Sequence, residues 1–114
     1  MDSNRKKQLK EAYKNSKPCM GVYQIENSVT GKKYIGITPN LKGTMNGNLF
    51  KLDSGMFKDR ELQEEWKRYG KKEFEQSILA ELDYDEDEAK ADYTEDLLVL
   101  RELVTENCIN KKYI

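Results

Sequence analysis

The chain has 114 residues, the size of one small domain. Hydrophobic residues make up 37% and charged residues 36%, a balance that fits a small core with a large solvated surface and excludes collagen-like and low-complexity chains. The longest apolar runs, such as residues 97–100, fall far short of the roughly 20 residues of a spanning helix, so the sequence excludes a membrane protein. Two cysteines without a CxxC motif, and no histidine, argue against a disulfide scaffold or a zinc site and favour the cytoplasm.

The formal net charge of −1 hides an uneven distribution along the chain. Residues 1–20 carry six basic and two acidic side chains, whereas residues 81–106 carry two basic and eleven acidic ones. The basic side chains of residues 5–17 are one candidate for contacting nucleic acid. The acidic segment, residues 81–96, is open to two interpretations: a solvated loop and helix start, which the helix dipole favours, or a surface for a protein partner.

The first half of the chain predicts a helix followed by a hairpin. Residues 3–15 have an apolar stripe among lysines and predict a short helix within a basic N-terminal extension, residues 1–19. Residues 20–26 and 33–38 are rich in β-branched and aromatic side chains and predict two strands. The short glycine-containing segment between them predicts an antiparallel pairing.

The second half predicts two helices, a strand and a last helix. Apolar residues at helical spacing predict helices over residues 41–52 and 59–69, and Gly70 is a natural end for the second. A strand is expected over residues 74–82 and a helix over residues 89–104. Trp66 and Phe74 fall on apolar stripes, so we expect them in the core. We expect one domain over residues 20–114.

Two tripeptides of the expected hairpin carry the most information. Gly21-Val22-Tyr23 and Tyr34-Ile35-Gly36 are separated by ten residues. A hairpin of this kind can place both phenols side by side, if its register puts them on one face of the sheet. Glycine at positions 21 and 36 would let a ligand or a neighbouring backbone approach the strands closely. Plain cross-strand packing of the aromatic rings is the structural alternative.

These tripeptides resemble the signature of the GIY-YIG endonuclease superfamily. The resemblance continues through residues 38–42, 61–66, 69–70 and 74 to Glu95 and residues 109–110, and so covers about residues 20–114 in the family's order. It implies an α+β fold in which helices flank a small three-stranded antiparallel sheet. It also implies cleavage of phosphodiester bonds in DNA with one divalent metal, Mg²⁺ or Mn²⁺.

The resemblance implies roles for four residues. Glu95 matches the carboxylate that holds the metal, fifteen positions before Asn110, which would brace the site by hydrogen bonding. Tyr23 matches the base or water-orienting tyrosine, and Tyr34 would position the phosphate or the water. A phenol ionises near pH 10, so Tyr23 could act as a base only if a metal or a cation lowered its pKa. We expect both phenols and Glu95 to converge on one pocket, although Glu95 could also be an ordinary exposed carboxylate.

The family pattern breaks on the helix expected after the hairpin. Where the family carries an arginine that faces the phosphate and commonly a histidine four residues later, this chain has Thr44 and Asn48. Threonine offers one neutral hydroxyl in place of a permanent charge, and asparagine cannot shuttle protons near neutral pH. Lys42 and Lys51 share this helix, but neither occupies the arginine position. The residues expected to contact substrate are Gly21, Lys33, Gly36, Lys42, Thr44, Asn48 and Lys51.

Three functions follow as hypotheses. The first is a metal-dependent DNA endonuclease whose hydrolysis is impaired by the changes at Thr44 and Asn48. The second is a non-catalytic module that binds nucleic acid, through residues 5–17 and Lys32-Lys33, or another protein. The third is a protein inhibitor or adaptor that uses the acidic segment 81–96. The net charge of −1 and the lost arginine favour impairment, because DNA-cutting domains profit from positive charge. The retained Glu95 favours residual catalysis.

Overall fold

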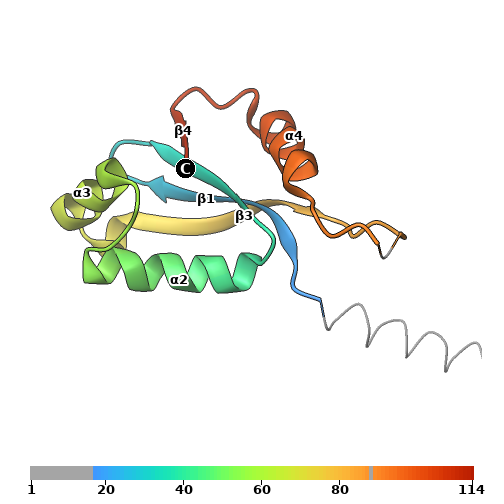
Figure 1. Ribbon diagram of the computed structural model, residues 1–114. Coiled ribbons are helices and arrows are strands. Elements are labelled where there is room, and N and C mark those ends of the chain that lie inside the picture. Colours follow the sequence, from blue (N-terminus) through green and yellow to red (C-terminus); the bar gives the residue numbers. More distant parts are fainter. Residues whose placement is uncertain (1–16, 88) are drawn as a thin grey trace, which may run out of the picture.

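The computed structural model describes residues 17–87 and 89–114, which form a four-stranded sheet with helices on both faces (Figure 1). In spatial order the strands are β3-β1-β2-β4. The elements in chain order are β1 (Met20–Asn27), β2 (Lys33–Thr38), α2 (Leu41–Ser54), α3 (Arg60–Tyr69), the short 3-10 helix η1 (Lys71–Glu73), β3 (Phe74–Leu82), α4 (Thr94–Thr105) and β4 (Lys111–Tyr113). The helix expected over residues 3–15 lies outside the described residues. Within the described residues no helix has the length and apolar character needed to cross a membrane.

The predicted hairpin is confirmed, and its register puts both signature tyrosines on one face. β1 and β2 are antiparallel, with Tyr23 opposite Gly36 and Ile25 opposite Tyr34. Directly opposite residues of an antiparallel pair share a face of the sheet. Gly31 closes the turn with a φ of 74°, a left-handed conformation that glycine adopts at no steric cost.

The expected three-stranded antiparallel sheet is wrong in one respect, because the C-terminal residues add a fourth strand. β4 pairs in parallel with β2, so the sheet is mixed. The Lys33 amide donates to the Asn110 carbonyl at 2.9 Å, and the Ile114 amide donates to the Ile35 carbonyl at 2.9 Å. This pairing satisfies backbone groups on the outer edge of β2 that a three-stranded sheet would leave without partners.

The helices after the hairpin agree with the sequence prediction, while the last helix begins later than expected. The side chains of Asn40 and Asp59 cap α2 and α3, accepting from the backbone amides of Gly43 and Leu62 at 3.1 and 3.0 Å. α4 begins at Thr94 instead of residue 89. The Asp92 carboxylate accepts from the Thr94 amide at 3.0 Å, which favours a turn before the helix.

Two hydrophobic clusters lie on opposite faces of the sheet. The face toward α2 and α3 holds the larger cluster, in which Trp66 and Phe74 lie with ring centroids 5.1 Å apart, as expected of core residues. Its buried members are Tyr23, Ile25, Tyr34, Leu41, Leu52, Phe57, Leu62 and Trp66. The other face carries Met20, which packs against Tyr93 and Leu97 at the start of α4. Figure 1 shows α2 and α4 on opposite sides of the sheet, so the tyrosines face away from α4.

Substituting Gly21 by alanine tests the close approach of β3 to β1. A Cβ at Gly21 would lie 2.1 Å from the Ala80 carbonyl oxygen, whereas a Cβ at Gly47 of α2 would meet nothing within 4 Å. We expect Gly21→Ala to lower the free energy of unfolding by about 1–3 kcal/mol, because backbone atoms must move. Gly47→Ala should raise it by up to about 1 kcal/mol through helix propensity. Urea unfolding measures both, and equal effects of the two substitutions would contradict the packing.

Candidate active site

Tyr23 is a buried phenol that lies across Gly36. Its side chain is 4% exposed, and a Cβ at Gly36 would come within 2.5 Å of its hydroxyl oxygen. The absence of a side chain at Gly36 therefore makes room for the Tyr23 ring, and not for a bound ligand. Burial raises the pKa of Tyr23 above its usual value, and a side-chain hydrogen bond with Asn48 opposes this shift only in part. The phenol thus keeps its proton at neutral pH.

Asn48, at the family's histidine position, belongs to a closed polar network between α2 and β3. Its side chain is buried, and its amide donates to Gln76 Oε1 at 3.3 Å. The Gln76 amide in turn donates to the Met45 carbonyl oxygen at 3.0 Å. Together with the bond between Asn48 and Tyr23, these contacts join β1, α2 and β3 through neutral groups. Gln76 had no role in the sequence prediction, since a lone glutamine on a strand carries no signal.

Thr44, at the family's arginine position, is half-buried and also has a hydrogen-bond partner in the same chain. Its hydroxyl lies 2.6 Å from the Thr38 hydroxyl, and the Thr38 oxygen accepts from the Asn40 amide at 3.0 Å. The other two candidates on α2, Lys42 and Lys51, are exposed. Within the described chain neither lysine makes a hydrogen bond or ion pair with Thr44. Among the described residues, therefore, neither of these lysines supplies a cation to Thr44 through a polar contact.

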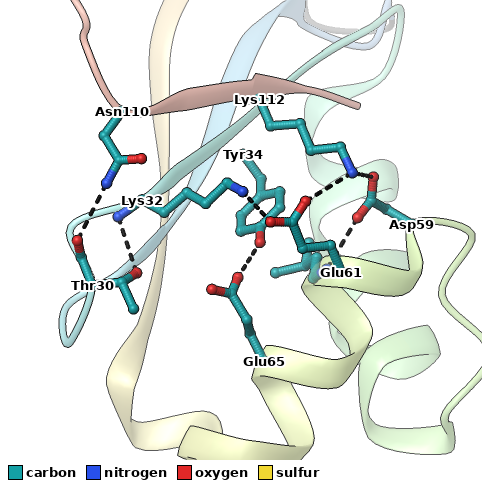
Figure 2. A network of polar contacts seen from close by, with 9 residues as sticks. Thr30, Lys32, Tyr34, Asp59, Glu61, Glu65, Asn110 and Lys112 are labelled. Carbon is teal, nitrogen blue, oxygen red and sulfur yellow. Dashed lines mark hydrogen bonds and ion pairs between the residues drawn. The ribbon is translucent and has the colours of Figure 1, made fainter.

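Tyr34 is buried, and its hydroxyl donates to the Glu65 carboxylate of α3 (Figure 2). Burial raises the pKa of Tyr34 well above its usual value, and the hydrogen bond to Glu65 raises it further. The Lys32 ammonium lies 5.3 Å from the centre of the Tyr34 ring. The hydroxyl proton of Tyr34 is therefore already engaged in a hydrogen bond with a carboxylate of the same chain. Glu65 was missed in the sequence because charged residues beside the buried edge of a helix are usual.

A network of ion pairs surrounds Tyr34 at the start of α3. Lys32 and Lys112 both contact the Glu61 carboxylate, and Lys112 also lies 3.0 Å from Asp59 Oδ2. Figure 2 shows the two lysines reaching this carboxylate from the hairpin and from β4. The hydrogen bonds from Lys32 and Lys112 lower the pKa of Glu61. No sequence pattern placed Lys112 here, because β4 itself was not expected.

Asn110 and Lys33 lie beside the hairpin loop. The exposed Asn110 amide donates to the Thr30 carbonyl oxygen at 3.2 Å, so it braces the loop (Figure 2). Lys33 neighbours Tyr34 on β2, and successive strand residues point to opposite faces. The Lys33 side chain is therefore on the face away from the tyrosine rings.

Glu95 is exposed in the first turn of α4. This helix packs through Tyr93 and Leu97 on the face of the sheet opposite Tyr23. Among the described residues no hydrogen bond or ion pair joins Glu95 to either tyrosine, so no contact supports the expected shared pocket. The described residues also contain no group of three or more side chains of His, Cys, Asp or Glu that could hold a metal. A single carboxylate still fits Mg²⁺, which commonly keeps several waters and takes phosphate oxygens from a substrate.

Comparisons with known proteins agree with this fold. The family model of the GIY-YIG catalytic domain matches residues 19–99. The catalytic domain of the homing endonuclease I-TevI is 24% identical, with a TM-score of 0.64, and the match covers 83% of this chain and 97% of that chain. A mutant of the catalytic domain of the intron endonuclease I-TevI is 22% identical, with a TM-score of 0.61 and coverage of 78% and 82%. No curated protein matches the chain.

At these identities the structural matches show a shared fold. The family model, in contrast, spans well over half of the chain and includes both signature tripeptides. The chain therefore belongs to the GIY-YIG family.

Proposed function

We propose that the chain is a GIY-YIG-type, DNA-directed endonuclease-like protein whose divalent-metal-dependent hydrolysis is impaired. The observation that carries the proposal is that Thr44 and Asn48, the two residues that differ from the family pattern, are hydrogen-bonded to other side chains of this protein. Thr44 bonds to Thr38, and Asn48 bonds to Tyr23 and Gln76, so both side chains already have hydrogen-bond partners within the chain. The family match and the likeness to I-TevI, which is named as a homing endonuclease, support the nuclease part of the proposal.

The missing cation is the first reason to expect slow hydrolysis. In phosphoryl transfer, negative charge is spread over the equatorial oxygens of the transition state, and fixed cations stabilise it. Removing one such group typically lowers the rate by about a hundredfold or more. Thr44 offers a neutral hydroxyl that Thr38 already engages, so it cannot replace that stabilisation.

The state of Tyr23 is the second reason. A phenol with an ordinary pKa near 10 is ionised in only about one molecule in a thousand at pH 7. Burial raises the pKa of Tyr23 further, which makes the phenolate rarer still. Tyr23 therefore does not serve as a base in the state described, and its hydroxyl instead orients the Asn48 side chain.

The proposal assigns the metal to Glu95. A divalent ion bound there would neutralise phosphate charge and lower the pKa of a bound water. An exposed carboxylate is a suitable ligand for Mg²⁺ or Mn²⁺. The first turn of α4 holds the Glu95 side chain in this exposed position.

A plasmid-nicking assay with Mn²⁺ tests the proposal. We expect slow nicking by the unmodified protein, at least a tenfold faster rate for Thr44→Arg because a cation is restored, and loss of both activities on Glu95→Ala. Glu102→Ala, which removes another exposed carboxylate of α4, is the matched control and should leave the rate unchanged. Fast, Glu95-dependent nicking by the unmodified protein would contradict impairment.

The same assay separates the second candidate, a non-catalytic nucleic-acid-binding module. The closed network of Tyr23, Asn48 and Gln76 favours this candidate too, because it stabilises the fold without needing a substrate. If neither the unmodified protein nor Thr44→Arg cuts while duplex DNA still binds, the module is the better description.

Alkaline titration tests the burial of the two phenols. Because the pKa values of Tyr23 and Tyr34 are raised in the folded state, the unfolded chain loses these protons first as the pH rises. The free energy of unfolding should therefore be unaffected by these groups below about pH 10 and fall above it. Urea unfolding between neutral and alkaline pH measures the slope. Tyr23→Phe and Tyr34→Phe should each flatten it, and an unchanged slope in both variants would show that neither phenol is shifted.

A further inference from the structure

We propose that Lys32 and Lys112 form an additional phosphate-binding site at the β2–β4 edge, which the Glu61 carboxylate of α3 occupies until a backbone phosphate of duplex DNA replaces it. The inference rests on the proposed function, since it takes DNA as the partner. It adds a site that neither the signature tripeptides nor the altered positions on α2 include.

The geometry is that of a small anion held by two cations. Lys32 Nζ contacts one oxygen of the Glu61 carboxylate, and Lys112 Nζ lies 3.0 Å from the other oxygen. The lysines come from the hairpin loop and from β4, and Figure 2 shows their ammonium groups converging on Glu61. A DNA phosphate likewise presents two free oxygens to lysine donors, so it can take the place of the carboxylate.

The lysines are held in place by groups other than Glu61. The Lys32 ammonium lies 5.3 Å from the centre of the buried Tyr34 ring, which attracts a cation through its π face. Lys112 lies 3.0 Å from Asp59, whose side chain is only 13% exposed. Asp59 is itself fixed, because its other oxygen accepts from the Leu62 amide and caps α3. Both ammonium groups would therefore stay near the edge after Glu61 moves away.

Glu61 is the exchangeable member of the network. Its side chain is 45% exposed, and ion pairs in such positions contribute only about 0–1 kcal/mol. A phosphate of DNA can therefore displace Glu61 from the lysines at little cost in stability. The release of condensed counterions from the DNA favours this exchange. The two lysines lower the pKa of Glu61, so at neutral pH it is a charged competitor for the same donors.

The network could also serve only to fasten α3 to the sheet edge. That role predicts lower stability for Glu61→Gln and no gain in DNA binding. The phosphate site predicts a gain, because removing the internal anion frees two cations. Urea unfolding and DNA binding therefore separate the two roles, and the described chain offers a matched control in Glu64, an exposed carboxylate on the same helix without a hydrogen bond or ion pair.

The test is fluorescence anisotropy with a labelled DNA duplex at low salt. We expect Glu61→Gln to tighten binding about three- to tenfold and to steepen the salt dependence by about one phosphate contact, while Glu64→Gln changes affinity less than about twofold. Adding Lys32→Gln and Lys112→Gln to Glu61→Gln should remove the gain. Adding Lys58→Gln, which removes an exposed lysine between α2 and α3, should preserve it.

Each other outcome overturns the site in a recognisable way. Equal binding by Glu61→Gln and Glu64→Gln, or a gain that survives loss of both lysines, overturns the site alone and leaves the nicking result to decide the proposed function. No DNA binding by any variant overturns both the site and the choice of DNA as partner. If inorganic phosphate stabilises Glu61→Gln against urea while DNA does not bind, the site belongs to free phosphate and the DNA assignment is wrong.

Discussion

The pairing of Tyr23 with Gly36 across the β1–β2 hairpin determines most of what the site can do. Because glycine has no side chain, the Tyr23 ring can lie over the neighbouring strand with its hydroxyl directed toward α2. The same register places Tyr34 two residues away on the same face, where α3 covers it. Both phenols therefore point into the layer between sheet and helices, and each hydroxyl meets a side chain of that layer. A slip of one residue between β1 and β2 would put the two rings on opposite faces of the sheet.

Thr44 and Asn48 together replace two basic side chains of the family pattern with small neutral ones. An arginine facing a phosphate needs an anion or water for its donors, since a buried unpaired charge is costly. Small neutral side chains can be satisfied by the protein itself, and the structure shows both doing so, with Thr38 and with Tyr23 and Gln76. The polar groups at both positions are hydrogen-bonded within the chain, while neither Thr44 nor Asn48 carries a charge that could attract a phosphate. The shared fold therefore does not by itself establish that this chain shares the family's chemistry.

Residue spacing along the chain was enough to predict the helices and strands that depend on neighbouring residues alone. The hairpin, α2, α3 and β3 follow from strand-like and helix-like spacing bounded by turn and cap residues such as Asn40 and Gly70. β4 was missed because it has three residues and forms only when the end of the chain returns to β2. The candidate residues were predicted by family resemblance, but their surroundings were not. The partners Glu65 and Gln76 come from elements distant in sequence. The spacing of residues in a strand or helix does not predict which distant side chain a tyrosine will contact.

The uneven charge of the chain bears on how a protein of net charge −1 could approach DNA. α4 lies across the sheet from α2 and α3 (Figure 1), and one helical layer alone is about 10 Å thick. The Debye length at physiological ionic strength is about 8 Å, so exposed charges farther than this from the β2–β4 edge are largely screened by salt. Glu102 of α4 and Glu106, which follows this helix, lie nearer, since they line a pocket together with Lys111 and Tyr113 of β4. A carboxylate in direct contact with two lysines is not screened in this way. For binding at the proposed site on the β2–β4 edge, we therefore expect the charge of Glu61, which contacts both lysines, to matter more than that of an acidic residue without such a contact.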